Sequence, residues 1–563
     1  MLIWVCNPQY GADMSELAKA AKAASTTEAT KQAQRPDAKA ELLAAAAHEF
    51  VFAVVGHIGS GTSNVASAFE ELLGKQKQPF HTSVLKARDV IEAWAKASGK
   101  EHPATTAPQS IETATSWQNL GDAMRGDTKD HAAVARALIG KIRETRALAV
   151  NQPLQDGEPV EPDGKPRAYI LDSLRHPAEV NLLRHLYQDA FVLIGVVCDA
   201  DVREARLQDK LGNPPKAALQ EFMKRDEKDD LKHGQQVAKT FQIADFYVDN
   251  TPDRFIYTES GQKKKENPEW DINDKLSRLV RIISHDGIER PELAETAMHH
   301  AYSAQLRSAC LSRQVGAALM DRDGNLLSTG TNEVPKAGGG VYGEIFSDSI
   351  AAENSKVKVP LDQRCSQRPD KYCSSTREQN AIIDTIIADV ADLQPLTSEN
   401  VTKLRQRLKH GRVGDTIEFS RAVHAEMDAL LSASRSGGST VGTRLFVTTY
   451  PCHYCARHII SAGVDEVQYI EPYFKSLAAR LHSDAIQQRL TKWIPPSKGG
   501  DTVLFRPFTG VAPRLYRRAF FKDRDLKNDL TGEQHISPPD WGTSWHLRKK
   551  SYLQLEAQLT KTE

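Results

Sequence analysis

The sequence predicts two α/β domains in one chain. Its 563 residues exceed what a single hydrophobic core usually organises. In the first half, an apolar strand at 51–55 leads into a glycine-rich turn and then a helical pattern. In the second half, an apolar strand at 445–447 leads through a proline to two cysteines that begin another helix. Repeated strand–turn–helix units of this kind indicate sheets that are covered by helices.

The composition is that of an ordinary soluble globular protein, with 40% hydrophobic and 26% charged residues. Lys+Arg and Asp+Glu both total 73, so the formal net charge is +0. That balance gives no support to an extended basic surface for nucleic acid. The seven cysteines are scattered and do not indicate a disulfide framework, and no apolar run is long enough to span a bilayer. These features predict a cytoplasmic protein without membrane association.

Shifts in composition divide the chain into five parts. The expected parts are a variable or disordered tail (1–48), a first α/β domain (49–257), a polar and charged connector (258–290), a second α/β domain (291–510) and a C-terminal extension (511–563).

The turn after the first strand has the form of a P-loop, in which backbone N–H groups bind a phosphate at a helix N-terminus. Thr62 stands where a P-loop has lysine, while Ser63 keeps the hydroxyl that would reach Mg²⁺. We therefore expect nucleotide binding, with Mg²⁺, but not efficient phosphoryl transfer. The alternative is a glycine-rich turn that binds no ligand. The candidate nucleotide-binding residues are Gly56, Gly59, Ser60, Gly61, Thr62, Ser63 and Asp172.

Later segments of the first domain resemble a nucleotide kinase. Asp172 ends an apolar strand and is placed as a Walker B carboxylate would be. Arg203, Arg206 and the charged stretch 224–226 are similar to the lid of such kinases, where arginines bind phosphates. The alternative for these charges is a solvated helix face. The resemblance implies a P-loop kinase-like domain with a mostly parallel sheet.

The second domain contains a zinc-binding pattern, formed by His424, Cys452 and Cys455. One imidazole and two thiolates fill three positions of a tetrahedron and leave the fourth for water. Glu426 follows His424 too closely to share its direction as a ligand, so we expect it to transfer protons. The alternatives are a structural zinc site or a chance CxxC. The upstream HxE, the strand and Pro451 favour the catalytic site, and the whole pattern is the signature of zinc-dependent cytidine and nucleotide deaminases.

Four segments, at 310–317, 330–335, 424–426 and 451–455, resemble the deoxycytidylate deaminase family in their order. The last two contain the zinc-binding pattern. The segment at 471–478 is similar to the stretch that follows the family's zinc helix. The resemblance implies a cytidine-deaminase-like α/β/α sandwich. It also implies substrate contacts, with a sugar contact from Asn332, a pocket wall that includes Tyr473 beside Phe474, and phosphate contacts from Lys475 and Arg313. A turn-forming asparagine and core aromatics are the alternatives.

A second zinc ion is also suggested by this resemblance. Cys310 stands where one of its ligands would lie, and Cys365, Cys373 and His410 fall in a long insertion between Val341 and Ser420. Together these four residues would form a Cys₃His site. The alternative is that the thiols are inert or buried.

The order of the two domains resembles the bacterial anti-phage dCTP deaminases. This resemblance implies a zinc enzyme that deaminates dCTP, dCMP or both, that depletes the dCTP pool, and whose first domain senses a nucleotide. It implies a homo-oligomer, and a regulatory nucleotide or small RNA as a further partner. One rival is an RNA or single-stranded DNA cytidine deaminase, which should have a basic groove. Another is a nucleotide-sensing switch whose deaminase half binds a partner.

Overall fold

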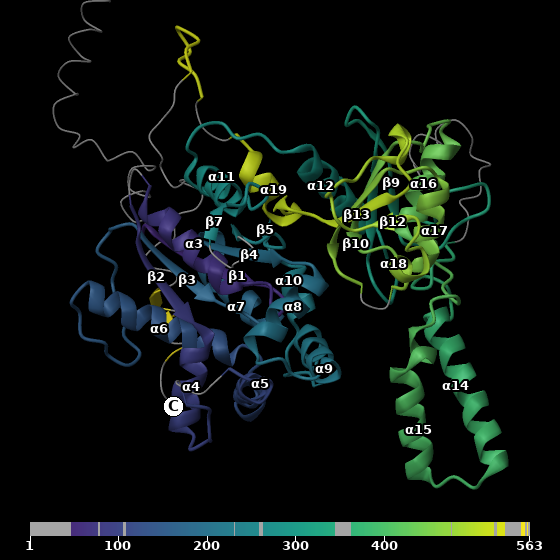
Figure 1. Ribbon diagram of the computed structural model, residues 1–563, viewed down its shortest axis with the longest axis horizontal. Coiled ribbons are helices and arrows are strands. Elements are labelled where there is room, and N and C mark those ends of the chain that lie inside the picture. Colours follow the sequence, from purple (N-terminus) through teal and green to yellow (C-terminus); the bar gives the residue numbers. More distant parts are fainter. Residues whose placement is uncertain are drawn as a thin grey trace, which may run out of the picture.

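The computed structural model describes residues 47–76, 79–104, 109–229, 231–257, 263–343, 362–473, 476–522 and 526–534, with short pieces between 553 and 560. It contains two α/β domains that lie side by side (Figure 1). The fold class predicted from the sequence is thus confirmed. The predicted tail lies outside the described residues except for its last two positions. Across the described residues, no helix combines the length and the apolar character that crossing a membrane requires.

The first domain is built on a six-stranded sheet in the order β14-β5-β4-β1-β3-β2. Strands β1 to β5 are parallel, whereas β14 runs antiparallel to β5. Every residue of β1 and β4 is buried, as expected for strands that are covered on both faces. The strands are β1 (Glu49–Val55), β2 (His81–Lys86), β3 (Arg167–Asp172), β4 (Phe191–Val197), β5 (Phe246–Asp249) and β14 (Gly510–Val511).

Helices cover this sheet and follow its strands along the chain (Figure 1). Because β1 lies between β3 and β4, the strand order reverses at β1, and ligands of open α/β sheets bind at such a point beyond the carboxyl ends of the strands. The P-loop sequence occupies that place, between β1 and α3. The helices are α3 (Thr62–Gly74), α4 (Ala87–Ala97), α5 (Ile111–Asp127), α6 (Ala133–Ala149), α7 (Pro177–Tyr187), η1 (Gln188–Ala190), α8 (Ala200–Lys210), α9 (Lys216–Glu227) and α10 (Val237–Phe241).

Strand β6 (Phe255–Tyr257) ends just before the predicted connector and pairs with β7 (Lys263–Glu266), which lies within it, as does helix α11 (Ile272–Ser284). Although the connector is rich in polar and charged residues, α11 is not solvated on all sides. Its apolar face, which includes Leu276 and Leu279, is fully buried and packs against α3. The polar residues that dominate this stretch therefore cover a helix that belongs to the core.

The second domain has a mixed six-stranded sheet in the order β12-β13-β11-β10-β8-β9. Helix α12 packs against one face at Gly316, where an added Cβ would lie 2.0 Å from the Ala301 carbonyl oxygen. Helix α16 packs against the other face at Gly330, where an added Cβ would lie 2.1 Å from the Ala425 carbonyl oxygen. The elements are α12 (Leu293–Gln305), β8 (Gly316–Met320), β9 (Leu326–Thr331), α16 (Ala425–Arg435), β10 (Arg444–Thr449), α17 (His453–Ser461), β11 (Glu466–Glu471), α18 (Ala478–Leu481), β12 (Ile486–Gln487), η3 (Pro496–Lys498) and β13 (Val503–Pro507).

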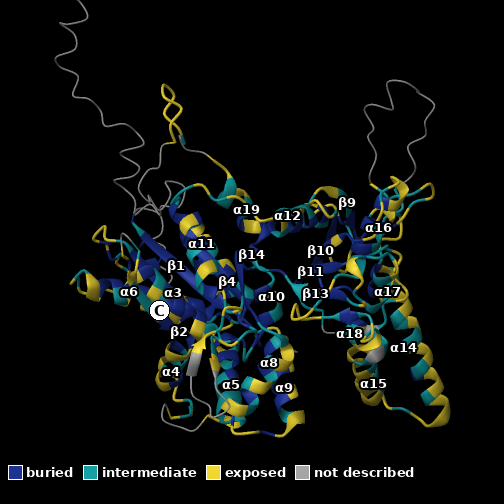
Figure 2. Ribbon diagram, turned by 45° about the horizontal axis from the view of Figure 1, so that its top comes forward, coloured by how far each residue is buried: buried dark blue, intermediate teal, exposed yellow. Residues whose placement is uncertain are grey.

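The insertion forms a helical hairpin of α14 (Ser374–Leu393) and α15 (Ser398–His410), followed by η2 (Arg412–Asp415). The hairpin projects away from the sheet, and most of its surface is exposed or half-buried (Figures 1 and 2). Its place in the fold is set by the chain on either side of it, which borders the pocket described below.

Beside a hydrophobic cluster within the second domain, a larger buried cluster extends across both domains. It runs from β1 through α11 and α12 to Ala318 and Phe446 in the second sheet. Past β13 the chain returns to the first domain, where β14 pairs with β5 and helix α19 (Pro513–Phe520) packs on α11 and α12. Further along, the carboxylate of Glu556 pairs with Arg146, which is fully buried and also pairs with Glu49.

Candidate active site

The three predicted zinc ligands converge in the second domain. The Nδ1 atom of His424 lies 3.3 Å from the Cys452 sulfur and 3.4 Å from the Cys455 sulfur. Their three donor atoms all lie within 4.8 Å of one another. One imidazole nitrogen and two sulfurs are a donor set that zinc prefers, and this spacing allows one ion to contact all three. The residues therefore fit a zinc ion and leave one position open for water.

Two helix N-termini position these ligands. His424 is the N-cap of α16, and Cys452 is the N-cap of α17. The Cys452 sulfur accepts a hydrogen bond from the Cys455 backbone N–H at 3.4 Å. A hydrogen bond from the Cys455 side chain is the largest cause that lowers the pKa of Cys452, and the same contact raises the pKa of Cys455. Cys452 is therefore held as a thiolate, the form that binds metal.

Glu426 lies in the first turn of α16 and its side chain is 4% exposed. Burial raises the pKa of Glu426 to about 7, and the negative charge of Cys452 acts in the same direction. A carboxyl group with a pKa near neutrality both accepts and donates protons, as a general acid–base requires. The side chain also lines the same pocket as His424 and Cys452.

A pocket of ≈ 400 Å³ opens over these residues. Its volume suits a small-molecule ligand. Tyr473 and Arg313 line it, and the guanidinium of Arg313 lies 5.5 Å from the centre of the Tyr473 ring. Arg313 also forms an ion pair with Glu471 at 3.3 Å. Lys475 and Phe474 lie outside the described residues, so their predicted contacts stay predictions.

Asn332 also lines the pocket, but its amide is engaged with the protein backbone. The Oδ1 atom accepts a hydrogen bond from Val315 N–H at 2.7 Å, and the Nδ2 atom donates to the Arg313 carbonyl at 2.7 Å. The side chain therefore fixes the loop that carries Arg313. One amide hydrogen and one lone pair are left over for the predicted sugar contact.

The structure does not gather the four residues proposed for a second zinc ion. Cys310, Cys365 and Cys373 all line the catalytic pocket, and His410 ends α15. Among the described residues, one group of His, Cys, Asp and Glu donors is close enough to hold a metal, and it consists of His424, Cys452 and Cys455. Cys373 instead lies 3.1 Å from the Ser312 hydroxyl. The second zinc ion stays a prediction without a formed ligand set.

Pocket residues that the sequence did not single out include Arg421, Thr449 and Tyr450. Arg421 stands three positions before His424, and the other two directly precede the Pro451 motif, so proximity to the zinc motifs could have indicated them. Lys228, at the end of α9 in the first domain, also lines this pocket. No local pattern could have predicted that contact.

The P-loop forms the expected turn at the N-terminus of α3. Gly61 adopts φ 81° as its N-cap. The Ser63 hydroxyl donates a hydrogen bond to Asp172 at 2.6 Å, so the two residues predicted to act on Mg²⁺ are side by side. A protein carboxylate already approaches the loop, because Ile58 N–H donates to Asp226 at 2.8 Å.

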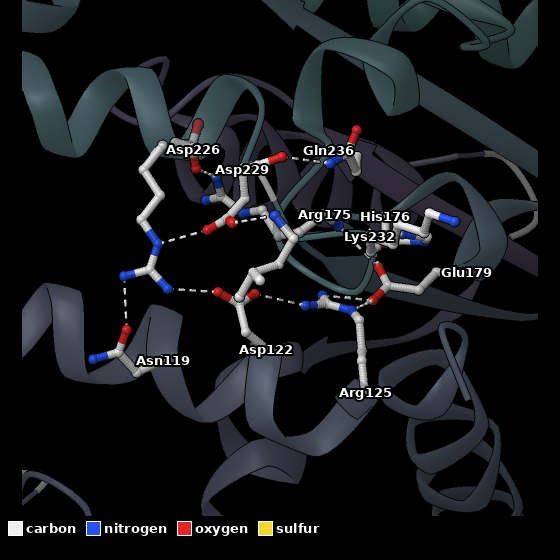
Figure 3. A network of polar contacts seen from close by, with 12 residues as sticks. Asn119, Asp122, Arg125, Arg175, His176, Glu179, Asp226, Asp229, Lys232 and Gln236 are labelled. Atoms are coloured by element: carbon white, nitrogen blue, oxygen red, sulfur yellow. Dashed lines mark hydrogen bonds and ion pairs between the residues drawn. The ribbon is translucent and has the colours of Figure 1, made fainter. Parts of the chain in front are cut away.

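Asp226 belongs to a network of buried charges between α5, α7 and the end of α9 (Figure 3). The other carboxylate oxygen of Asp226 pairs with Arg175, and burial raises the pKa of Asp226. The network continues through paired carboxylates and guanidinium groups, so the region predicted to be a lid is tied to the P-loop. Its further members include Asn119, Asp122, Arg125, Glu179, Arg225 and Asp229.

The predicted lid arginines are placed differently from one another. Arg203 is 4% exposed and lies against the P-loop, where a Cβ on Gly59 would approach the Arg203 carbonyl oxygen to 2.9 Å. Its guanidinium is 3.6 Å from Glu227. Arg206 instead donates to the Asn250 carbonyl at 2.8 Å and pairs with Asp253. Arg203 is therefore near the predicted phosphate site, whereas Arg206 anchors the chain after β5.

Known proteins are similar to parts of this chain. Residues 291–471 match the family model "Cytidine and deoxycytidylate deaminase zinc-binding region". Deoxycytidylate deaminase of Enterobacteria phage T2 is 29% identical over 183 residues, covering 32% of this chain and 82% of that protein. A UPF0200/UPF0201 protein of Archaeoglobus fulgidus is 24% identical over 323 residues, covering 54% of this chain and 84% of that protein.

Solved structures that are similar to parts of this chain include a deaminase and a sugar kinase. The dCMP deaminase of cyanophage S-TIM5 covers 39% of this chain and 99% of its own, with 18% identity and a TM-score of 0.19. A gluconokinase from Sinorhizobium meliloti covers 37% and 86%, with 14% identity and a TM-score of 0.19. The donor set, the pocket and the family match together lead to one conclusion. The C-terminal half of the chain carries a zinc-binding hydrolase domain of the cytidine and deoxycytidylate deaminase type.

Proposed function

We propose that the protein hydrolytically deaminates deoxycytidine nucleotides, converting dCTP, dCMP or both to the uracil nucleotide and ammonia. The observation that carries this proposal is the convergence of three zinc ligands beside a buried carboxylate in one pocket. The deoxycytidylate deaminases that match most of their own length over the same region support this choice of substrate.

The chemistry expected of Glu426 follows from its position. Zinc, when bound, supplies a water molecule with a lowered pKa. Glu426 accepts the proton of that water and delivers it to N3 of the cytosine ring. A further proton passes through Glu426 to the amine at C4, so that the C4–N bond breaks as the new C4–O bond becomes a carbonyl. Burial of Glu426 favours this role because no bulk water competes for the proton.

The remaining residues would position the nucleotide. Tyr473 offers an aromatic wall for the base, and Asn332 holds the loop that presents Arg313 to the pocket. Arg313 would contact a phosphate, as would Lys475. A homo-oligomer belongs to the same proposal, as does control by a regulatory nucleotide or a small RNA.

The first domain is proposed to be a nucleotide sensor. The contact between Ser63 and Asp172 supports Mg²⁺-linked nucleotide binding, and Thr62 in place of lysine argues against phosphoryl transfer. The proposed role of the whole protein is to deplete dCTP in defence against phage. It is supported by the order of the two domains, and it is tested by nucleotide pools in infected cells that carry either the wild type or Glu426→Ala.

One assay separates the candidate activities. The purified, zinc-loaded protein is incubated with dCTP, dCMP, CTP and a cytosine-containing oligonucleotide, and uracil products are quantified by chromatography. We expect product from dCTP or dCMP and none with Glu426→Ala. Product from the oligonucleotide alone would instead identify a nucleic-acid deaminase. No product from any substrate, with zinc present at one ion per chain, would favour a partner-binding switch.

A further inference from the structure

The catalytic pocket is bordered by positive charge from both domains. Lys228, Arg313 and Arg421 line it, and among the described lining residues Glu426 is the one carboxylate. Glu426 lies beside the zinc ligands, so the three cations have no acidic neighbour within the pocket wall. An excess of cations in a small cavity favours an anionic ligand.

The three cations are not equivalent. Arg313 is paired with Glu471, which offsets part of its charge. Arg421 donates to the Gln363 carbonyl at 3.3 Å, and the described residues place no carboxylate within 4.0 Å of it or of Lys228. Lys228 is exposed, so its side chain is accessible to a ligand in the pocket.

The position of Lys228 is fixed although its side chain is exposed. It is the C-cap of α9, and its backbone N–H donates to the Lys224 carbonyl at 3.2 Å. The residues on either side are anchored in the buried network, Asp226 by Ile58 N–H and Asp229 by Arg225 at 2.8 Å (Figure 3). A cation on a fixed backbone loses less freedom on binding than one on a mobile loop.

The second domain contacts the first at α8, which packs against α9. Helices α8 and α9 lie on the side of the first domain that faces the second (Figure 1). Arg489, which follows β12, pairs with Asp201 at the start of α8 and lies 3.5 Å from Asp199. Lys228 of the first domain therefore lies at the edge of the pocket. Both the fold of the first domain and the interface with the second support this position.

We propose that Lys228 binds the 5′-phosphate groups of the nucleotide substrate, so that the kinase-like domain supplies part of the deaminase pocket. This inference rests on the proposed deamination of deoxycytidine nucleotides. Lys228 is a binding residue for an anionic tail and takes no part in the chemistry at C4. A substrate without phosphate does not use it, and a longer phosphate chain uses it more.

The test measures binding by calorimetry in full-length, zinc-loaded Glu426→Ala protein, where no turnover occurs. The ligands are dCTP, dCMP and deoxycytidine. Adding Lys228→Ala should weaken dCTP binding about tenfold and leave deoxycytidine unchanged, as expected for the loss of one charge-assisted contact. Lys228→Glu should weaken dCTP by about a hundredfold, and Lys228→Arg should restore it.

Lys224→Ala is the matched control, since Lys224 is exposed on the same helix one turn earlier and does not line the pocket. It should leave all three affinities unchanged. If Lys228→Ala changes dCTP and deoxycytidine by the same factor, or changes neither, the inference is wrong. Failure of the proposed function would be seen separately, as wild-type protein that binds nucleotides but forms no uracil. A parent protein that binds neither dCTP nor dCMP would overturn both.

Discussion

The zinc site and the P-loop are both built at helix N-termini, but their polar groups are engaged differently. At the zinc site, the turns before α16 and α17 bring three donor atoms within 4.8 Å of one another. At the P-loop, the turn before α3 already receives a protein carboxylate, because Ile58 N–H donates to Asp226. A metal site is specified by its own ligands, whereas a phosphate loop also depends on residues that compete for its backbone N–H groups.

The largest effect is expected at the zinc site. Cys455→Ala removes a ligand that is 1% exposed and should lower deaminase activity to background. The free energy of unfolding should also fall by several kcal/mol, since metal binding contributes to folding. Metal analysis and chemical unfolding check this together. Retention of one zinc ion per chain with normal turnover would refute the ligand assignment.

Glu426→Ala separates proton transfer from metal binding. It should abolish detectable deamination, because the loss of a general acid–base slows catalysis by about 10²–10⁴-fold. Zinc content should remain at one ion per chain, because Glu426 is not among the three converging donors. A parallel loss of zinc and activity would mean that Glu426 supports the metal rather than the chemistry.

A moderate effect on nucleotide binding is expected at Asp226, the carboxylate that contacts the P-loop. Asp226→Asn weakens the acceptor of Ile58 N–H and the partner of Arg175. If the carboxylate competes with phosphate, affinity for ATP should rise roughly tenfold, while stability falls by about 1–3 kcal/mol. Calorimetry with ATP and urea unfolding measure the two changes. Weaker ATP binding would show that Asp226 supports the loop instead of competing for it.

The smallest effect is expected from Ser63→Ala. It removes the hydrogen bond to Asp172 and the proposed Mg²⁺ ligand, so stability should change by about 1 kcal/mol. ATP binding should become several-fold weaker in the presence of Mg²⁺ and should not change in its absence. Thr82→Ala serves as a control, since its hydroxyl contacts Glu70 at 3.5 Å, away from the loop. An equal loss with and without Mg²⁺ would remove the metal role.

These variants test the P-loop more selectively than a bulky substitution at Gly61 would. That glycine has φ 81°, and an added Cβ would lie 2.3 Å from the Asn250 amide nitrogen. Asn250 in turn donates to the Ser60 carbonyl and accepts from Trp270. A valine there would disturb the loop, the end of β5 and the segment before α11 together, so loss of nucleotide binding could not be attributed to phosphate approach.

The sequence was sufficient for the parts of the site that are set by local spacing. His424, Cys452 and Cys455 take the places that their motifs require, and the strand predicted at 168–172 becomes β3, with Asp172 beside Ser63. Each motif fixes the end of a strand or the start of a helix locally, and the sheet brings the motifs together, although His424 and Cys452 are 28 residues apart and Ser63 and Asp172 are 109 apart.

Long-range contacts were not predictable in the same way. Lys228 reaches a pocket whose other residues begin at Cys310, and no periodic pattern records that approach. The second zinc ion was inferred from thiols that share a pocket wall without converging. The stretch around α11 has a polar composition, yet the spacing of its apolar residues places one face in the shared core.

The return of the chain to the first domain has a consequence for synthesis. The edge of the first sheet is completed by β14, and Arg146 gains its second carboxylate from Glu556. A ribosome adds about 5–20 residues each second, so the nascent first domain waits some tens of seconds for these partners. During that interval the edge of β5 is unpaired and open to another strand. The N-terminal half is thus completed last, after the catalytic half has been translated.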